Sequence, residues 1–174
     1  MKTKLWMIVV VVAFALILFG CTSPPTNPDN NLPLDNNTAY KPATFKVVEN
    51  SVCVTQGKPI IRLYSTTWCP HCQWVKDTFD KVAKEYVDAG KIVAHHWELD
   101  TNDDTLTPGS DILPESETKV FQQFDSKGSI PAFVFGCKYY RIGNGYEAGK
   151  RLDLEEAEFR EVIERLIADT NNLN

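Results

Sequence analysis

The stretch that decides the fold is IIRLYSTTWCPHC, at residues 60–72. Its first six residues are mostly apolar and partly β-branched, which predicts a buried central strand. After a short turn the apolar side chains recur with the period of a helix, at Val75, Phe79, Val82 and Tyr86. Gly90 stands where the glycine that follows a helix belongs. The sequence therefore predicts a strand that leads through a tight turn into a helix.

The remaining segments continue an α/β pattern. The sequence predicts a short strand-like stretch within 45–54, strands at 92–99, 132–135 and 139–142, a polar loop at 101–114, and helices at 116–124 and 153–169. The last helix is acidic, and its predicted buried stripe is Leu154, Phe159, Val162, Ile163, Leu166 and Ile167. We therefore expect an α/β domain in which helices cover both faces of a mixed sheet.

Composition and charge exclude several classes of protein. The chain has 174 residues, of which 43% are hydrophobic and 24% are charged, with 9 glycines and 10 prolines. These values exclude collagen, low-complexity disorder and a polytopic membrane protein. The formal net charge is −5. Because an acidic chain repels phosphate backbones, nucleic acid is not an expected partner.

The N-terminus has the parts of an export signal. A basic start precedes the apolar run 5–19 and then Gly20 and Cys21. The sequence around Cys21 resembles the lipobox of prokaryotic lipoproteins, in which the cysteine becomes the lipidated first residue. Residues 1–20 are therefore predicted to be a signal peptide of this type, and the alternative is an uncleaved signal anchor. Both place the domain outside the cytoplasm, tethered to a membrane.

A Pro- and Asn-rich segment follows the signal. Residues 21–42 are predicted to be a flexible tether because they lack the apolar residues needed for a core. Residues 43–170 remain as the folded domain, a usual size for one domain.

The residues Cys69-Pro70-His71-Cys72 carry the predicted chemistry. Cys69 lies at a strand-to-helix turn, where the helix dipole and free N–H groups favour a thiolate. Pro70 suits the first helical turn, since its missing N–H is no loss there. His71, when protonated, would add positive charge beside the sulfur. Cys72 lies one turn further and can close a disulfide with Cys69, so the pair is predicted to be a nucleophile and its resolving partner.

With this motif the chain resembles the thioredoxin superfamily. The similarity rests on the strand and motif of residues 60–72, the helix after it, and Ser129-Ile130-Pro131 before the next strand; it extends over nearly all of residues 45–170. The resemblance implies a thioredoxin fold with a cis Pro131 against the active-site disulfide. It also implies that Ile130 offers its backbone to the substrate and that Pro131 and Trp68 are substrate-binding residues as well.

The Pro-His dipeptide resembles that of the DsbA-type oxidases of the cell envelope. Two departures from that family stand out. The DsbA type carries a sizeable helical insertion before the cis proline. Here only residues 101–114 are additional to a thioredoxin-sized domain before Pro131, so no such insertion is expected. The buried acid that the family keeps in the strand before the motif is absent, since Arg62 and Leu63 stand there. The transfer of a proton to and from Cys72 must then use another group or water.

Simpler interpretations remain for each part of the motif. Cys69 and Cys72 would form half of a structural zinc site if His95 and His96 supplied the other ligands, although zinc sites usually show a second close pair. His71 would be a solvated side chain, and Pro131 an ordinary trans residue at the start of a strand. We expect no metal and no cofactor.

The resemblance also bears on Cys53 and Cys137. In a thioredoxin-like sheet the strand after Pro131 runs antiparallel to residues 60–65, so Cys137 approaches the start of that strand, just after Cys53. We predict a structural disulfide between the two, and the alternative is a pair of unpaired buried thiols. Export favours the disulfide because extracytoplasmic thiols tend to oxidise.

One further pattern is weak. Asp100, Asn102, Asp104 and Asp111 fall at calcium-loop positions, but Thr105 occupies the position that requires glycine. A solvated acidic loop is the expected structure.

Two functional hypotheses follow. The first is a membrane-tethered thiol–disulfide oxidoreductase that acts on exported protein thiols and disulfides, with the oxidase direction favoured and a membrane or soluble redox partner recycling it. Reductase and isomerase activities are the closest alternatives. The second hypothesis is a non-catalytic module that binds a metal or chaperones a partner.

Overall fold

A computed structural model describes residues 40–107, 109–110 and 112–172. Its elements in chain order are β1 (Lys46–Val47), β2 (Val54–Thr55), β3 (Lys58–Ser65), α1 (Pro70–Asp88), β4 (Val93–Glu98), β5 (Asp103–Asp104), α2 (Glu115–Phe124), β6 (Ala132–Phe135), β7 (Tyr139–Ile142), the 3₁₀ helix η1 (Glu147–Gly149) and α3 (Leu152–Asn171). The predicted signal, Cys21 and most of the predicted tether lie outside the described residues. No helix of the described part is long and apolar enough to cross a membrane.

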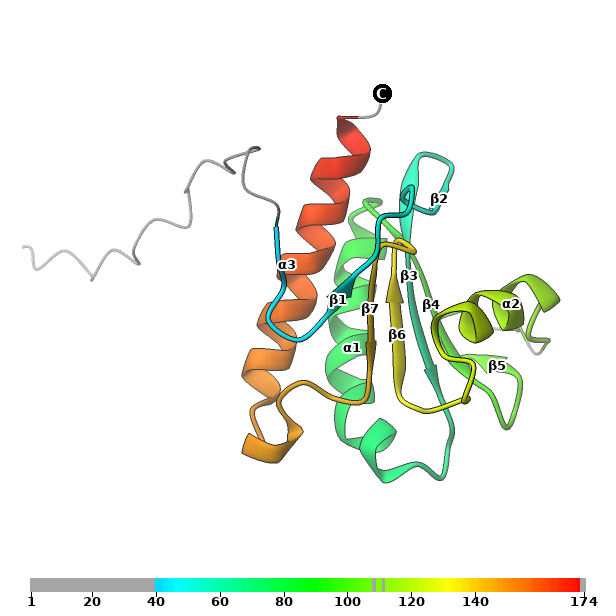
Figure 1. Ribbon diagram of the computed structural model, residues 1–174. Helices are drawn as coiled ribbons and strands as arrows, with labels where there is room; N and C mark the ends of the chain where they lie inside the picture. The colour runs from blue at the N-terminus through cyan, green and yellow to red at the C-terminus, as the bar shows by residue number, and fades with distance from the viewer. Residues whose placement is uncertain (1–39, 108, 111, 173–174) are drawn as a thin grey trace, which may run out of the picture. The chain divides into compact units, whose positions relative to one another are not determined.

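The sheet is mixed, as the sequence predicts. Its strand order is β1-β7-β6-β3-β4-β5, with β2 paired to β3 as a hairpin (Figure 1). The strands β3 and β4 run parallel, while β6 runs antiparallel to both β3 and β7. β3 lies between β4 and β6, and seven of its eight residues are buried. It is the central strand that its apolar sequence predicts.

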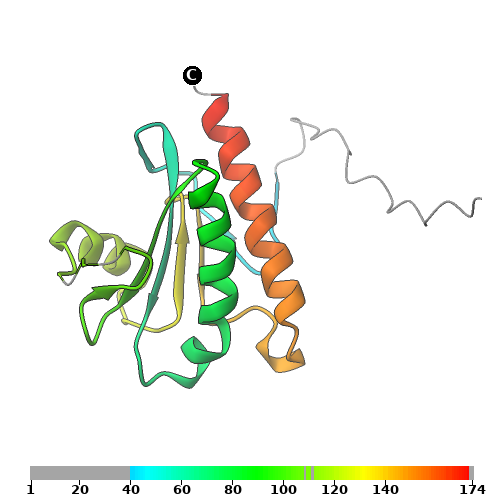
Figure 2. The same ribbon diagram turned by 180° about the vertical axis from the view of Figure 1, so that it is seen from behind.

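Helices cover both faces of the sheet, which confirms the predicted α/β class and thioredoxin fold. On one face, Ile61 and Leu63 of β3 pack with apolar residues of α1 and α3. On the other face, Tyr64 of β3 packs with Phe121 of α2. Figures 1 and 2 show α1 and α3 lying side by side, with α2 apart from them. Burial of each such side chain contributes about 1.5–3 kcal/mol.

The segment before β3 forms little sheet. The short strand predicted within 45–54 is β1, and β2 begins at the last residue of that range; each has two residues. The described chain also packs from Tyr40, three positions before the predicted start of the domain: the Tyr40 and Tyr139 rings meet edge to face at 5.7 Å, and Pro42 is buried. The side chains of this segment therefore cover the core, although its backbone forms little sheet.

The buried stripe of α3 also differs from the prediction. Leu154 is only half-buried, while Glu155 and Glu158 are fully buried. Both carboxylates meet the buried guanidinium of Arg141 from β7, at 2.5 and 3.4 Å. Because a buried charge needs a partner of opposite sign, these acids replace apolar side chains at the start of the helix.

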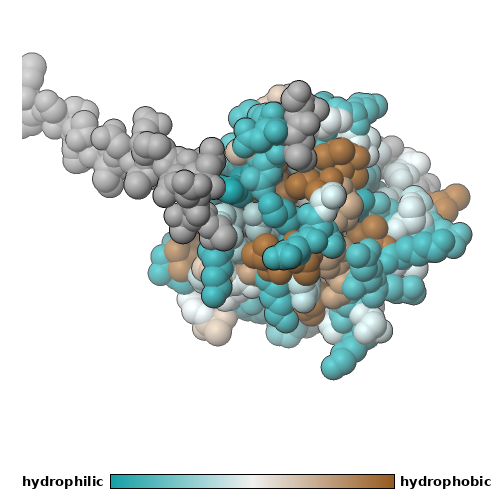
Figure 3. All heavy atoms as spheres, turned by 45° about the horizontal axis from the view of Figure 1, so that its top comes forward, coloured by the Kyte–Doolittle hydropathy of each residue, from teal (hydrophilic) through white to brown (hydrophobic). Residues whose placement is uncertain are grey.

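Large apolar side chains at the surface are scattered. Those more than about a third exposed are Val47, Val54, Trp68, Val87, Ile112, Ile142 and Leu152. Figure 3 shows a face on which hydrophilic side chains surround smaller hydrophobic patches. Trp68, at 69% exposure, directly precedes Cys69.

Candidate active site

The dithiol lies where β3 turns into α1. Cys69 is the N-cap of α1, with φ −77° and ψ 116°, and Pro70 occupies the first helical turn. The Cys69 Sγ accepts a hydrogen bond from the backbone N–H of Cys72 at 3.2 Å. The first sulfur is therefore held by one of the N–H groups that the start of a helix leaves free.

The two cysteines differ in their surroundings. Both are free thiols, with Cys69 4% exposed and Cys72 1% exposed. Burial, together with a hydrogen bond to Cys69, raises the pKa of Cys72 to about 12. A pKa this high keeps the Cys72 thiol protonated at neutral pH, while the Cys69 sulfur lies at the start of α1.

The turn before the motif is held from β4. Both oxygens of Asp100, just beyond β4, accept hydrogen bonds from the Thr67 backbone N–H, at 3.0 and 3.3 Å, and one of them also accepts from the Thr67 hydroxyl. The Gln73 side chain donates to the Thr67 carbonyl at 2.8 Å. The hydrogen bonds from Thr67 hold the pKa of the Asp100 carboxyl below its usual value. The turn is therefore held by Asp100 on the side of β4 and by Gln73 on the side of α1.

A cis proline lies at the same end of the sheet. The Ile130–Pro131 peptide bond is cis, the form that the thioredoxin resemblance implies. In the antiparallel pairing of β6 with β3, Ala132 stands opposite Tyr64, so Pro131 comes beside the end of β3 that leads into the motif. Ile130 is half-buried and packs against the core on the α2 face.

His71 contacts a segment that the sequence analysis did not single out. Its Nδ1 lies 2.9 Å from both carboxylate oxygens of Glu147. The Asn144 side chain donates to the His71 backbone carbonyl at 2.8 Å and to Glu147 Oε2 at 2.8 Å. The sequence analysis named neither Asn144 nor Glu147. The one indication of this contact was the expected strand order, because β7 ends at the end of the sheet where β6 begins, beside Pro131.

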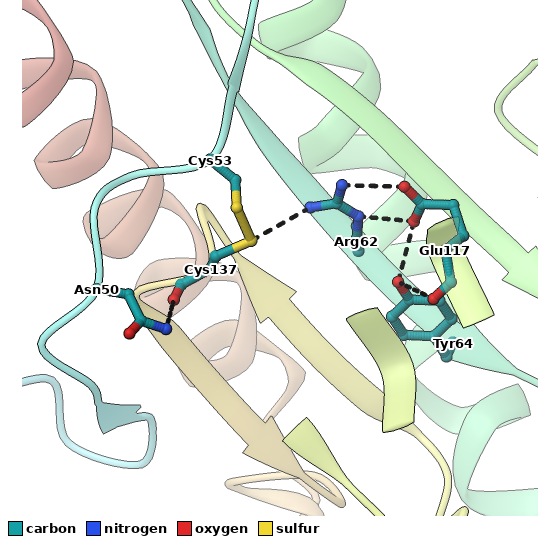
Figure 4. The surroundings of a disulfide bond; sticks show 6 residues. All are labelled: Asn50, Cys53, Arg62, Tyr64, Glu117 and Cys137. Atoms are coloured by element: carbon teal, nitrogen blue, oxygen red, sulfur yellow. Dashed lines mark hydrogen bonds and ion pairs between the residues drawn. A yellow bond between two sulfur atoms is a disulfide. The ribbon is translucent and has the colours of Figure 1, made fainter. Parts of the chain in front are cut away.

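Cys53 and Cys137 are joined in a disulfide at the other end of β3 (Figure 4). Their Cα atoms lie 5.4 Å apart, and the bond links positions separated by 84 residues. The Cys53 N–H also donates to the Gly136 carbonyl at 2.8 Å, so the backbones meet as well. This disulfide ties the segment before β2 to the β6–β7 turn, away from the dithiol.

Arg62 does not take the place of a buried acid beside Cys72. Its guanidinium forms a bidentate ion pair with Glu117 of α2, at 2.7 and 2.9 Å, and its Nη1 lies 3.9 Å from Cys137 Sγ (Figure 4). Burial works to raise the pKa of Glu117, but the hydrogen bond and charge of Arg62 outweigh it and hold that pKa below its usual value. Arg62 therefore belongs to the α2 face and the structural disulfide.

The other candidate ligands are engaged elsewhere. His95 contacts Asp104 at 2.7 Å, and His96 contacts Asp80 at 2.7 Å and Ser65 Oγ at 2.8 Å. Within the described residues no three His, Cys, Asp or Glu side chains gather in a way that could hold a metal. In the calcium-like pattern, Asp104 is buried rather than solvated, Asp100 binds Thr67, and Asp111 lies outside the described residues.

The fold and the site together define a thioredoxin-fold domain with a Cys-x-x-Cys dithiol at the start of its first helix. No family model matches the chain, and no curated protein matches it. Among solved structures it is similar to the crystal structure of an oxidised point mutant of DsbA1, with 13% identity and a TM-score of 0.45. That match covers 78% of this chain and 98% of the other chain.

Proposed function

We propose that this protein is an extracytoplasmic thiol–disulfide oxidoreductase, tethered to the membrane, that acts on cysteines of exported proteins through Cys69 and Cys72. The observation that carries the proposal is the asymmetry of the dithiol. Both sulfurs are buried, but Cys69 Sγ caps the N-terminus of α1, whereas burial and the hydrogen bond to Cys69 raise the pKa of Cys72 to about 12. Such a pair has one sulfur suited to attack and one suited to resolve.

The oxidase direction, which the Pro-His dipeptide favours, begins with Cys69 and Cys72 joined as a disulfide. A substrate thiolate attacks Cys69 Sγ, the bond between the two enzyme sulfurs breaks, and Cys72 leaves and takes up a proton. A second substrate thiolate then attacks the substrate sulfur of the mixed disulfide and releases Cys69. Two electrons have passed from the substrate dithiol to the enzyme, and a redox partner must accept them to restore the disulfide.

The location outside the cytoplasm rests on two features. The N-terminal 20 residues have the pattern of an export signal that ends before Cys21, and lipidation there, or an uncleaved anchor, would supply the membrane tether. The Cys53–Cys137 disulfide supports an oxidising compartment, since such bonds are rare in cytosolic proteins. Exported proteins are then the substrates within reach, and nucleic acid stays an unexpected partner.

Two alternatives make different predictions. A thioredoxin-like reductase or isomerase would use the same sulfurs, with Cys69 attacking a substrate disulfide and Cys72 releasing the product. The measured reduction potential against glutathione separates these directions. A non-catalytic module that binds a metal or chaperones a partner would need no reactive thiolate.

Alkylation of the reduced protein as a function of pH tests the proposal. With iodoacetamide and mass mapping, we expect Cys69 to be labelled faster than Cys72 near neutral pH. Cys72 should stay protected at pH values well above neutrality because its pKa is raised to about 12. Equal labelling rates of the two thiols at every pH would contradict the proposal. Protection of both sulfurs by added Zn²⁺ at stoichiometric amounts would favour the metal-binding module.

A further inference from the structure

The segment 143–151, which we call the bridging loop, contacts both halves of the candidate site. Its first residue donates from the Gly143 N–H to the carbonyl of Pro131 at 2.7 Å. The next residue, Asn144, donates to the backbone carbonyl of His71 at 2.8 Å. Glu147, in η1, binds the His71 ring at 2.9 Å. One loop thus joins the cis proline to His71, the second of the two residues between the cysteines.

The bridging loop is anchored to the core. Arg141 donates to the Gly143 carbonyl at 3.1 Å, and its guanidinium binds the buried Glu155 at 2.5 Å. The other oxygen of Glu155 accepts from the Tyr146 N–H at 2.8 Å. A Cβ on Gly145 would lie 2.6 Å from Thr44 Oγ1, so the loop approaches its neighbours as closely as glycine allows. The position of Glu147 is therefore imposed by the fold.

The orientation of Asn144 follows from its partners. Both groups within reach, the His71 carbonyl and the Glu147 carboxylate, accept hydrogen bonds, so the amide must turn its NH₂ group toward them. Its Oδ1 is buried and has no hydrogen-bond partner in the described part of the chain. Leaving that oxygen unpaired costs free energy, which the two hydrogen bonds of the NH₂ group offset.

Glu147 and the charged groups near it set the electrostatic environment of the His71 ring. Partial burial works to raise the pKa of Glu147, but hydrogen bonds from Asn144 and His71 outweigh it and hold that pKa below its usual value. The electrostatic attraction that helps to lower the pKa of Glu147 comes from His71. The nearby Arg151 is paired with Asp153 at 2.5 Å. Along the chain, the titratable residues nearest to His71 are Cys69 and Cys72.

We propose that Glu147 is the counter-ion of the His71 imidazole, and that Asn144 is the positioning residue that aligns the pair. The inference rests on the proposed function and names a regulation of the same site. An ionised carboxylate in contact with an imidazole favours its charged form. A positive charge on this ring favours the thiolate form of Cys69, which stands two positions before it in the motif.

The test compares Glu147→Gln with the wild type by alkylation of Cys69 with neutral iodoacetamide at several pH values. The Gln side chain keeps the shape but loses the charge. At pH 5.5 an imidazole with the ordinary pKa of about 6.5 is protonated without any partner, so the rate ratio of wild type to variant should be about one or below. At pH 7.5 such an imidazole is mostly neutral, so the effect of a counter-ion should raise the ratio to about two- to fivefold, as for an ion pair at a partly exposed site.

The control is the same substitution in a His71→Gln background, where the pH-dependent ratio should disappear. Glu147→Asp keeps the carboxylate, so it should retain part of the wild-type pH dependence of the alkylation rate. Asn144→Ala should lose part of that pH dependence. A ratio that is equal at every pH, or that persists without His71, would overturn the proposal. Alkylation needs no substrate, so this result is separate from whether Cys69 catalyses disulfide exchange.

Discussion

Replacing Cys69 by serine is expected to abolish disulfide exchange and to leave the fold unchanged. A serine hydroxyl can cap α1 as the Cys69 sulfur does, so the helix should keep its start. It cannot form or break a disulfide, so no mixed disulfide can arise. We expect rates of insulin reduction, and of oxidation of a reduced protein substrate, to fall by at least about a thousandfold, to the uncatalysed level.

Cys72→Ser is the matched control for this loss. It keeps the attacking sulfur but removes the resolving one, so substrate should be captured and not released. Near-normal turnover by Cys69→Ser, with unchanged circular dichroism, would show that the reactive sulfur lies elsewhere.

The second large effect is expected on stability. Replacing both Cys53 and Cys137 by alanine should lower the free energy of unfolding by about 4 kcal/mol, because the bond closes a loop of 84 positions and restricts the unfolded chain. Guanidinium unfolding of the wild type and of the double variant measures this difference in the free energy of unfolding. Cys69 and Cys72 are kept reduced in both proteins.

A reduced wild type provides the control for this double variant. Its stability should fall toward that of the variant, because both lack the bond while only one lacks the thiols. A difference below about 1 kcal/mol between oxidised wild type and variant would mean that the disulfide contributes little.

The elements around the dithiol were predictable because their signals are local. The apolar run of β3, the proline in the first turn and the helical period of α1 all act within a few residues of one another. The pairing of Cys53 with Cys137 required the topology implied by the thioredoxin resemblance as well. Those predictions agree with the described structure.

The contacts of the bridging loop were not predictable in the same way. His71 and Glu147 are 76 positions apart, and no periodicity connects them. The sequence analysis considered only the charge that a protonated His71 would add beside the sulfur, whereas its ring contacts the carboxylate of Glu147 at 2.9 Å. Similarly, Glu155 looks like a solvated helix residue in the sequence. Only the fold shows that it is buried against Arg141.

The most direct test of the dithiol mechanism is to trap the covalent intermediate. The Cys72→Ser variant, mixed with a protein disulfide and quenched with acid, should accumulate a mixed disulfide that peptide mapping places on Cys69 alone. If no adduct forms, or if it forms at Cys53 or Cys137, then the sulfur at the start of α1 is not the one that exchanges disulfides.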